Sequence, residues 1–497
     1  MNALRTLLAF CALLLLSTPV VAKTPARSAN EKATQQFYET IRSNPLTLRG
    51  FIAEMPKGGD LRVRLSESIY PEDYLLLAEK ENYCITLPTF FLVPPLNNAC
   101  PPGTSPAHKF FDNEANYQKA LKELNTLSHK ERTALISFAD ITADQFGFLL
   151  GTVVNNAAFQ KLDYMEVLVP WFPKEAEKEL KKIKWEGSPD EMVTKITTLP
   201  FMEHVADNAA TLQAVNAKAR VHSGSAKRDV TVRYIIEVDR TEDPLHVFAK
   251  LLYAYKTVLA NDDVGGVALS GDEAHPVALR DYKLQMQMLE ALAMRQEYRP
   301  IKPIITAGYL TLGMVQPVQF TDRIRSALTL GRASRISHGS SVMYENDPYG
   351  LLESLERTRT PVEIALTSEE HFRSITPAMN PFPVLKKFHI PVVLVTESGA
   401  INRFDITNEY TRAAQEYGLS YADVKALVRN TLEFSQLSGK SLWKTTAPYT
   451  VDKECRDSLE GKETGTCKKL LQDSPKARAQ WKLENAFTAF ERKYSAK

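Results

Sequence analysis

From residue 164 onward, the sequence alternates short runs rich in β-branched residues with amphipathic segments of helical period. This alternation predicts parallel strands joined by crossover helices. With an earlier run at 55–65, eight runs have the length of a strand, which predicts an α/β fold of the closed (β/α)8 type, a TIM barrel. An open, doubly wound sheet is the alternative, but no glycine-rich phosphate loop follows an early strand. The other seven runs are 164–169, 230–238, 265–269, 303–306, 335–338, 362–366 and 392–396.

The segments outside these runs predict the rest of the organisation. The first residues have the basic start, apolar middle and small-residue end of a signal peptide. Helical period over 29–47 predicts a helix before the barrel, and a second predicted helix ends the chain at about 475–494. The predicted parts are a signal peptide at 1–22, an N-terminal helical extension at 23–54, the barrel at 55–445, a cysteine-bracketed insertion after strand one at about 82–110, and a C-terminal tail at 446–497.

Four cysteines remain once Cys11 leaves with the signal peptide. They form two local pairs, Cys84 with Cys100 and Cys455 with Cys467, and an even count in an exported chain predicts two disulfides. Two pairs of buried thiols are the alternative. The insertion between the first two cysteines is rich in Pro, Asn and Gly, which predicts a loop. The signal peptide and the disulfides together predict a periplasmic or secreted protein.

The net charge of +2 argues against a nucleic-acid partner, because nucleic-acid binding needs a marked excess of basic residues. After the signal peptide, no run reaches the roughly 18 apolar residues that a membrane span requires.

The first predicted strand carries two arginines on one face. Arg62 and Arg64 are two residues apart, so the alternation of a strand points both into the barrel. A guanidinium group inside a barrel is costly unless carboxylates meet it. The surrounding residues, Met55-Pro56-Lys57 and Leu61-x-Val63-x-Leu65, resemble the opening motif of the adenosine deaminase superfamily, in particular its secreted growth-factor-related branch.

The resemblance continues at later strand ends. Gly271-Asp272-Glu273 resembles the substrate-lining turn of the family, and Arg335-Ile336-Ser337-His338-Gly339 matches its Arg-Ile-x-His-Gly motif. The cysteine-bracketed insertion also resembles one that marks the growth-factor-related branch. The resemblance implies a (β/α)8 barrel with a zinc ion that activates water to deaminate a purine nucleoside.

Six of seven positions that the resemblance assigns to zinc and catalysis carry other residues. His338 is the single match. Without the zinc ligands and the proton-transferring glutamate, both metal-activated hydroxide and the acid for the ring are lost. The sequence therefore predicts a catalytically inactive pseudoenzyme with no zinc or other cofactor, which acts by binding a ligand or a protein. An active deaminase or hydrolase using Glu397 and His338 is the alternative. The six altered positions are Arg62, Arg64, Thr306, Tyr309, Glu397 and Ser398.

Strands one and eight are neighbours in a closed barrel, so Arg62 and Arg64 are expected to reach Glu397, with Asp272 or Glu273 as further anchors. The alternative is that both arginines extend to solvent at the rim. Surplus positive charge predicts an anionic ligand beside a nucleoside-like one. A homodimer through residues 29–47, or another protein partner, is also predicted. The predicted ligand-binding residues are Arg62, Arg64, Gly271, Asp272, Thr306, His338 and Glu397.

Overall fold

The computed structural model describes residues 28–87, 89–97, 99–127, 131, 141–224, 229–401, 403–456 and 465–496. The predicted signal peptide, residues 1–22, lies outside the described residues.

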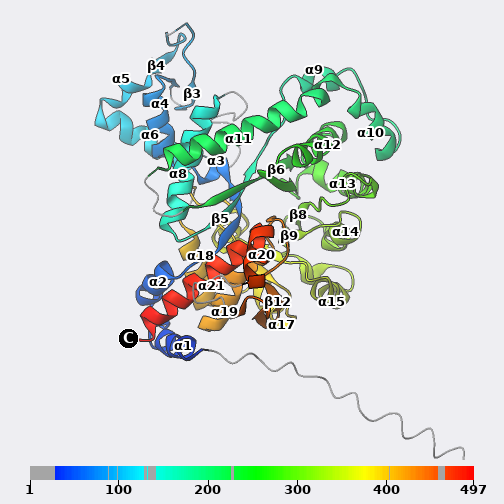
Figure 1. Cartoon of the computed structure of the whole chain (residues 1–497). Helices are drawn as coiled ribbons and strands as arrows, with labels where there is room; N and C mark the ends of the chain where they lie inside the picture. The colour runs from blue at the N-terminus through cyan, green and yellow to red at the C-terminus, as the bar shows by residue number, and fades with distance from the viewer. Residues whose placement is uncertain are drawn as a thin grey trace, which may run out of the picture.

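Eight parallel strands form one sheet that closes on itself (Figure 1). A parallel bridge joins Val63 to Glu397, and the amide of Glu397 donates to the carbonyl of Arg62 at 2.8 Å. The prediction of a (β/α)8 barrel is confirmed. In sheet order the strands are β1 (Gly59–Arg64), β5 (Tyr164–Val169), β6 (Thr231–Asp239), β7 (Val264–Ser270), β8 (Ile304–Ala307), β9 (Arg335–His338), β10 (Val362–Ile364) and β11 (Val392–Leu394).

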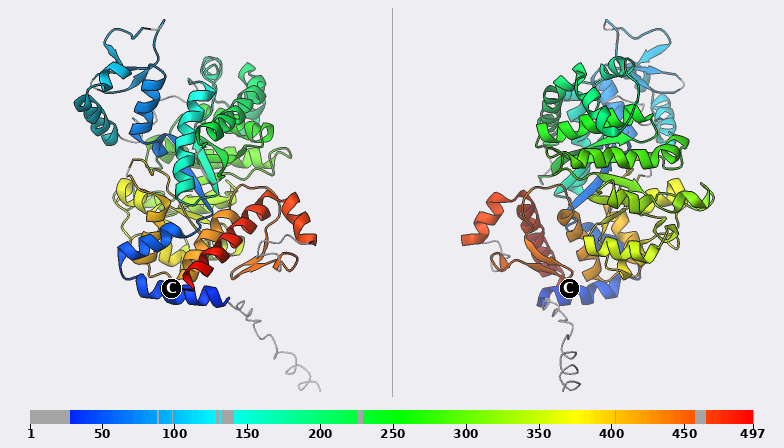
Figure 2. Two further views of the ribbon diagram at one scale, coloured as in Figure 1. Left: turned by 60° about the vertical axis from the view of Figure 1, so that its left-hand side comes forward. Right: turned by 90° about the vertical axis from the view of Figure 1, so that its right-hand side faces the viewer.

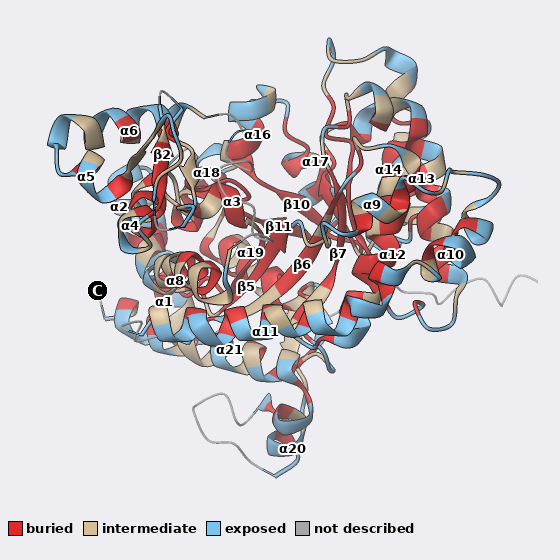
Figure 3. Ribbon diagram, turned by 90° about the horizontal axis from the view of Figure 1, so that it is seen from above, coloured by how far each residue is buried: buried red, intermediate tan, exposed pale blue. Residues whose placement is uncertain are grey.

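Helices surround the buried strands on all sides (Figure 3). Helix starts follow local capping chemistry: Asp243 accepts hydrogen bonds from the amides of Leu245 and His246, and Pro244 occupies the first turn of α12. The helices between and after the strands are α8 (Ala143–Phe159), α9 (Ala176–Leu180), α10 (Pro189–Thr197), α11 (Val205–His222), α12 (Pro244–Ala260), α13 (Pro276–Met294), α14 (Arg323–Thr329), α15 (Pro348–Thr358), α16 (Leu366–Arg373), α17 (Phe382–Lys387), α18 (Ile406–Glu416) and α19 (Tyr421–Glu433). Within the described ranges, no helix has the length and apolar character needed to cross a membrane.

The last two strands end earlier than the sequence pattern predicts. β10 stops at Ile364 because Leu366 already begins α16, and β11 stops at Leu394. Beyond β11 the chain turns sharply, since Asp60 accepts hydrogen bonds from the amide and hydroxyl of Thr396 and Glu397 has a φ of 58°. This turn brings the carboxylate of Glu397 to the end of β1.

The predicted helix at 29–47 is two helices, α1 (Ala29–Ile41) and α2 (Pro45–Glu54). The break occurs at Asn44, whose side chain caps α2 by accepting from the amides of Leu46 and Thr47. Both helices pack against α21 (Pro475–Tyr494), where the ring of Phe51 lies 5.0 Å from that of Phe490. The C-terminus therefore lies beside the N-terminal helices (Figure 2), and the predicted final helix is confirmed.

The insertion after β1 is more ordered than the loop predicted from its composition. A helical stretch, α3 (Leu65–Ser68) and α4 (Pro71–Lys80), leads into a three-stranded antiparallel sheet of β2 (Cys84–Thr86), β3 (Leu92–Val93) and β4 (Thr104–Pro106). Most of 84–106 is irregular, as the composition predicts, and the bond between Cys84 and Cys100 ties the first of these short strands to the segment before the last one. Two helices complete this region, α5 (Ala107–Phe111) and α6 (Glu114–Thr126).

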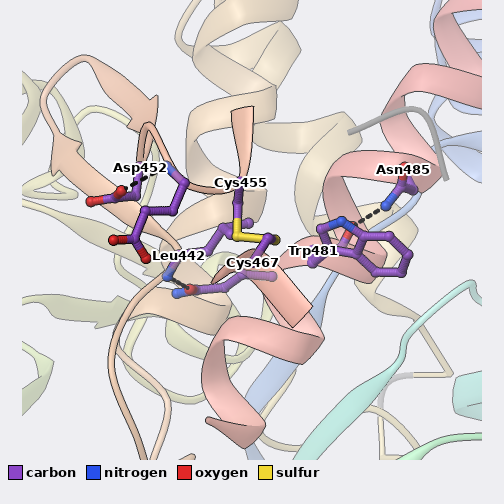
Figure 4. The surroundings of a disulfide bond; sticks show 8 residues. Leu442, Asp452, Cys455, Cys467, Trp481 and Asn485 are labelled. Carbon is purple, nitrogen blue, oxygen red and sulfur yellow. Dashed lines mark hydrogen bonds between the residues drawn. A yellow bond between two sulfur atoms is a disulfide. The ribbon is translucent and has the colours of Figure 1, made fainter. Parts of the chain in front are cut away.

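Both predicted disulfides are confirmed, with Cα atoms 5.5 Å apart for Cys84–Cys100 and 4.8 Å apart for Cys455–Cys467. The second bond lies in a small apolar cluster with Leu442 and Leu471, and Trp481 packs against this cluster (Figure 4). It links the hairpin of β12 (Trp443–Thr446) and β13 (Tyr449–Val451) to α20 (Gly465–Asp473), and so holds the tail together.

Candidate functional site

A cavity of about 300 Å³ lies at the carboxyl ends of the barrel strands, the edge where (β/α)8 proteins carry their sites. It brings together all of the positions that the sequence predicts for the site: Arg62, Arg64, Gly271, Asp272, Thr306, Tyr309, His338, Glu397 and Ser398. The sequence did not point to three further lining residues, Glu67, Phe372 and Arg373.

Arg62 lies at the centre of the barrel, and its side chain is 1% exposed. Its Nε donates to Oε1 of Glu397 at 3.1 Å. Its two terminal nitrogens donate to the hydroxyls of Ser337 and Thr306, at 3.0 and 3.3 Å. One guanidinium group therefore connects β1, β8, β9 and the turn after β11. The alternative in which Arg62 extends to solvent is wrong.

Arg64 lies two residues further along β1, nearer the mouth of the cavity, with 13% of its side chain exposed. Its Nε and Nη2 donate to Oε1 of Glu237, at 3.0 and 2.8 Å, and its Nη1 donates to Oε1 of Glu397 at 3.2 Å. The predicted pairing of both arginines with Glu397 is thus confirmed. Glu237, at the end of β6, was not predicted, because the sequence pattern gives no signal for which strand faces Arg64 across the barrel.

Asp272 and Glu273 do not anchor the two arginines as predicted. Asp272 pairs with Arg373 at 2.6 Å, and Glu273 pairs with Arg240 at 3.5 Å. The turn after β7 directs Asp272 to the mouth of the cavity, where its side chain is 47% exposed. This prediction was wrong because the two arginines find Glu237 and Glu397 closer to the barrel axis.

His338 is held between two carboxylates. Its Nδ1 lies 3.0 Å from Glu369 and its Nε2 lies 3.5 Å from Glu397. Burial acts to lower the pKa of His338, but the charge of Glu397 and the hydrogen bond to Glu369 outweigh burial and raise that pKa. The environment therefore favours the imidazolium form. Its ring stacks on Tyr309, with the ring centres 3.7 Å apart and the planes 9° apart.

Carboxylates outnumber the two central arginines. Within 4.0 Å, Arg62 and Arg64 meet four carboxylates, those of Glu67, Glu237, Glu363 and Glu397. Burial acts to raise the pKa of Glu397, but His338, Arg62 and Arg64 outweigh burial and hold that pKa well below its usual range. Glu397 is therefore ionised, and the number of carboxylates around the two arginines does not leave the surplus of positive charge that the arginines alone predict.

The barrel has a recognisable family. Residues 197–444, about half of the chain, match the family model described as adenosine deaminase. This chain belongs to the adenosine deaminase superfamily. The matched range includes β6 to β11, whereas Arg62 and Arg64 lie outside it.

A known enzyme is similar to part of the sequence, and solved structures are similar to the fold. An adenosine deaminase from Lacticaseibacillus paracasei is 31% identical over 113 residues, which is 22% of this chain and 32% of the relative, so the match spans about a third of that enzyme. The apo N6-methyl-AMP deaminase from Arabidopsis thaliana has 18% identity and a TM-score of 0.52, and the match covers 78% of this chain and 94% of that one. A zinc-bound amidohydrolase from Burkholderia ambifaria has 14% identity and a TM-score of 0.53, with coverages of 90% and 95%. The two structures show that the fold is shared.

The side chains at the centre of this superfamily barrel do not fit a zinc ion. Zinc needs lone pairs from neutral imidazoles, thiolates or carboxylates, and the guanidinium groups of Arg62 and Arg64 have none. Among the described residues, no group of three or more His, Cys, Asp or Glu side chains is arranged to hold a metal ion. Of the seven positions that the resemblance assigns to zinc and catalysis, His338 and Glu397 carry an imidazole and a carboxylate, but both are engaged with the arginine cluster or with Glu369.

Proposed function

We propose that the protein is an exported adenosine-deaminase-like pseudoenzyme, which binds a small molecule in the barrel mouth without deaminating it. The observation that carries this proposal is the ion pair between Arg62 and Glu397, at 3.1 Å, at the place where the family resemblance implies a metal. A guanidinium group supplies positive charge there, but it cannot lower the pKa of a water molecule by coordination as zinc does.

The side chains that remain are poor substitutes for an acid and a base. Tyr309 stands where the resemblance implies a glutamate, and its pKa is well above 10, because of burial and then the charges of Glu397 and Glu369. Such a phenol is a weak acid at neutral pH. Glu397, whose pKa is well below its usual range, is a weak base.

The alternative is an active hydrolase that uses Glu397 and His338. The spacing allows contact, since Nε2 of His338 lies 3.5 Å from Oε1 of Glu397. However, the same oxygen also meets Arg62 and Arg64, so proton transfer from His338 to Glu397 would leave a neutral carboxyl group beside one buried and one half-buried cation. We therefore favour the pseudoenzyme.

Export and the growth-factor-related branch are parts of the same proposal. Two disulfides support an oxidising compartment, periplasmic or extracellular. The disulfide-bonded insertion after β1 supports the branch assignment. Both depend on the resemblance and on the signal peptide, which lies outside the described residues.

Two kinds of binding partner follow from the sequence. A nucleoside-like molecule suits the size of the cavity, whereas an anion would meet four carboxylates around the two arginines. A homodimer through the N-terminal helices is the second proposal, supported by the exposed Leu46 at the start of α2. Gel filtration with light scattering tests it: a monomer at micromolar concentration would contradict a stable dimer.

The test of the proposed function combines metal analysis with an activity assay. The protein is purified without metal-affinity resin, analysed for transition metals, and incubated with adenosine while the conversion to inosine is followed by ultraviolet absorbance. We expect substoichiometric zinc and no turnover above buffer, with an active adenosine deaminase as the positive control. Stoichiometric zinc together with zinc-dependent turnover would overturn the proposal.

A further inference from the structure

The two central arginines of the cavity are already held by protein acceptors. All three nitrogens of the Arg62 guanidinium donate to protein oxygens, as do all three of Arg64. Neither arginine has a nitrogen left without a protein acceptor. Each guanidinium has five N–H groups, of which three are engaged in this way, and the four carboxylates that meet the two arginines would repel a phosphate or carboxylate entering the cavity.

Glu397 presents the opposite situation. The three cationic side chains that contact Glu397 all meet Oε1. Its second oxygen, Oε2, accepts no hydrogen bond from any residue that the structure describes, although Glu397 is only 3% exposed and lines the cavity. Since Glu397 lines the cavity, a ligand with an N–H group would find this oxygen free to accept a charge-assisted hydrogen bond.

The walls and the mouth add two features that suit a planar cation. The ring of Phe372 lines the cavity, and aromatic faces attract organic cations. The ring of Tyr309 is already engaged, because it stacks on His338 and the guanidinium carbon of Arg373 lies 5.0 Å from its centre. The Tyr309 hydroxyl is buried and has no hydrogen-bond partner in the described part of the chain. At the mouth, the charges of Asp272 and Arg373 offset one another at 2.6 Å, which leaves Oδ2 of Asp272 open to the entrance.

We propose that the cavity selects a nucleoside-sized organic cation, whose positively charged N–H group meets Oε2 of Glu397, and that it rejects the phosphorylated form of the same molecule. This inference rests on the proposed binding function and names its ligand class. The cavity of about 300 Å³ is at the lower end of the size range of small-molecule sites, so it suits a molecule of nucleoside size.

The test compares three ligands that share one scaffold and differ in charge: 1-methyladenosine, which is cationic at neutral pH, adenosine, which is neutral, and AMP, which is anionic. Isothermal titration of the full-length mature protein at pH 7 measures each affinity. We expect 1-methyladenosine to bind about tenfold more tightly than adenosine, as a charge-assisted hydrogen bond would give, and AMP to bind most weakly. Equal affinities, tightest binding of AMP, or no binding by 1-methyladenosine would overturn the proposal.

Two variants locate the interaction. Glu397→Gln removes the charge and is expected to abolish the preference for the cation, and Asp272→Asn at the exposed mouth is expected to reduce it severalfold. Glu353→Gln, on the exposed face of α15, is the matched control and is expected to bind as the wild type does. If Glu397→Gln fails to fold, the ligand series and Asp272→Asn still decide the matter. An unchanged preference in a folded Glu397→Gln protein would overturn the proposal.

The experiments distinguish failure of the proposed ligand class from failure of the proposed function. Absence of a preference for the cation, with no zinc and no turnover, overturns only the ligand class. Turnover of adenosine with stoichiometric zinc overturns the proposed function itself.

Discussion

The Nε of Arg62 lies 3.1 Å from Oε1 of Glu397, and both side chains are less than 5% exposed. Arg62 belongs to β1 and Glu397 follows β11, so this ion pair joins the first strand of the barrel to the turn after the last one. The backbone repeats the connection, because the amide of Arg64 donates to the carbonyl of Glu397 at 3.0 Å. The pair thus closes the barrel as well as filling its centre.

Removing one partner of this cluster should destabilise the fold strongly. In Glu397→Ala, the buried guanidinium group of Arg62 and the half-buried one of Arg64 lose their shared carboxylate, and we expect the free energy of unfolding to fall by about 3–5 kcal/mol. Urea denaturation followed by circular dichroism measures the change. The surface variant Glu353→Ala should change it by less than about 0.5 kcal/mol. A loss in Glu397→Ala no larger than in the control would contradict a central structural role.

Acid should weaken the same cluster at Glu237. Burial acts to raise the pKa of Glu237, but the charge of Arg64 and their hydrogen bond outweigh burial and lower it to about 2. A carboxyl group with a folded-state pKa below its unfolded value contributes stability above the unfolded pKa, and the contribution is lost as pH falls through the folded pKa. We expect a loss on the order of 3 kcal/mol between about pH 4.5 and pH 2.

The control for this pH dependence is Glu237→Gln, measured by urea denaturation at each pH. The variant lacks the titrating group, so its stability should vary less over the same window, while Glu353→Gln should follow the wild type. Parallel curves for the wild type and Glu237→Gln would show that Glu237 does not carry the effect.

At Tyr309 we predict a substitution that does not lower the free energy of unfolding. Its hydroxyl is buried without a hydrogen-bond partner among the described residues, so Tyr309→Phe should keep or raise the free energy of unfolding, by up to about 1 kcal/mol. Tyr309→Ala also loses the stack on His338 and should cost about 3 kcal/mol or more. Thermal denaturation of both variants gives the comparison, and a destabilised Tyr309→Phe would reveal a hydroxyl partner.

Chelation should leave the folded protein unchanged. The side chains at the barrel centre do not fit zinc, so overnight dialysis against EDTA and o-phenanthroline should not shift the thermal midpoint. Differential scanning fluorimetry before and after dialysis is sufficient, with a zinc-dependent deaminase treated in parallel. A midpoint lowered by chelation and restored by zinc would contradict the prediction.

The two disulfides should differ in what they stabilise. Cys455→Ser with Cys467→Ser opens a bond that lies in the small cluster of the tail, and we expect protease cleavage to rise in the tail, with a cost of about 3 kcal/mol to local stability. Cys84→Ser with Cys100→Ser should instead raise protease cleavage in the insertion after β1. Limited proteolysis with mass spectrometry identifies the cut sites, and identical patterns for the two double variants would contradict this separation.

Several of these features were accessible from the sequence because they depend on local pattern. Strand alternation places Arg62 and Arg64 on one face, and the neighbourhood of strands one and eight places Glu397 within their reach. The Asn-Pro dipeptide at residue 44 also contains the signal for the break between α1 and α2, although the longer helical period conceals it.

The missed features depend on contacts between segments that are apart in the sequence. Nothing in the spacing of Glu237 indicates that it faces Arg64, since three-dimensional register decides which strand ends meet. Asp272 was expected inside the cluster, but the turn after β7 directs it to Arg373. The composition of the insertion predicts a loop, and it gives no signal for the short strands that pair within it.

The C-terminal helix α21 has a consequence for how the molecule can be used. It packs against α1 and α19, and Lys476 at its start reaches the carbonyl of Glu433 at 2.9 Å, near the amino edge of the strands. The cavity opens at the other edge, where the strands end. A fluorophore or surface tether attached behind α21 therefore leaves the entrance unobstructed, so the protein can be immobilised in one orientation for ligand screening.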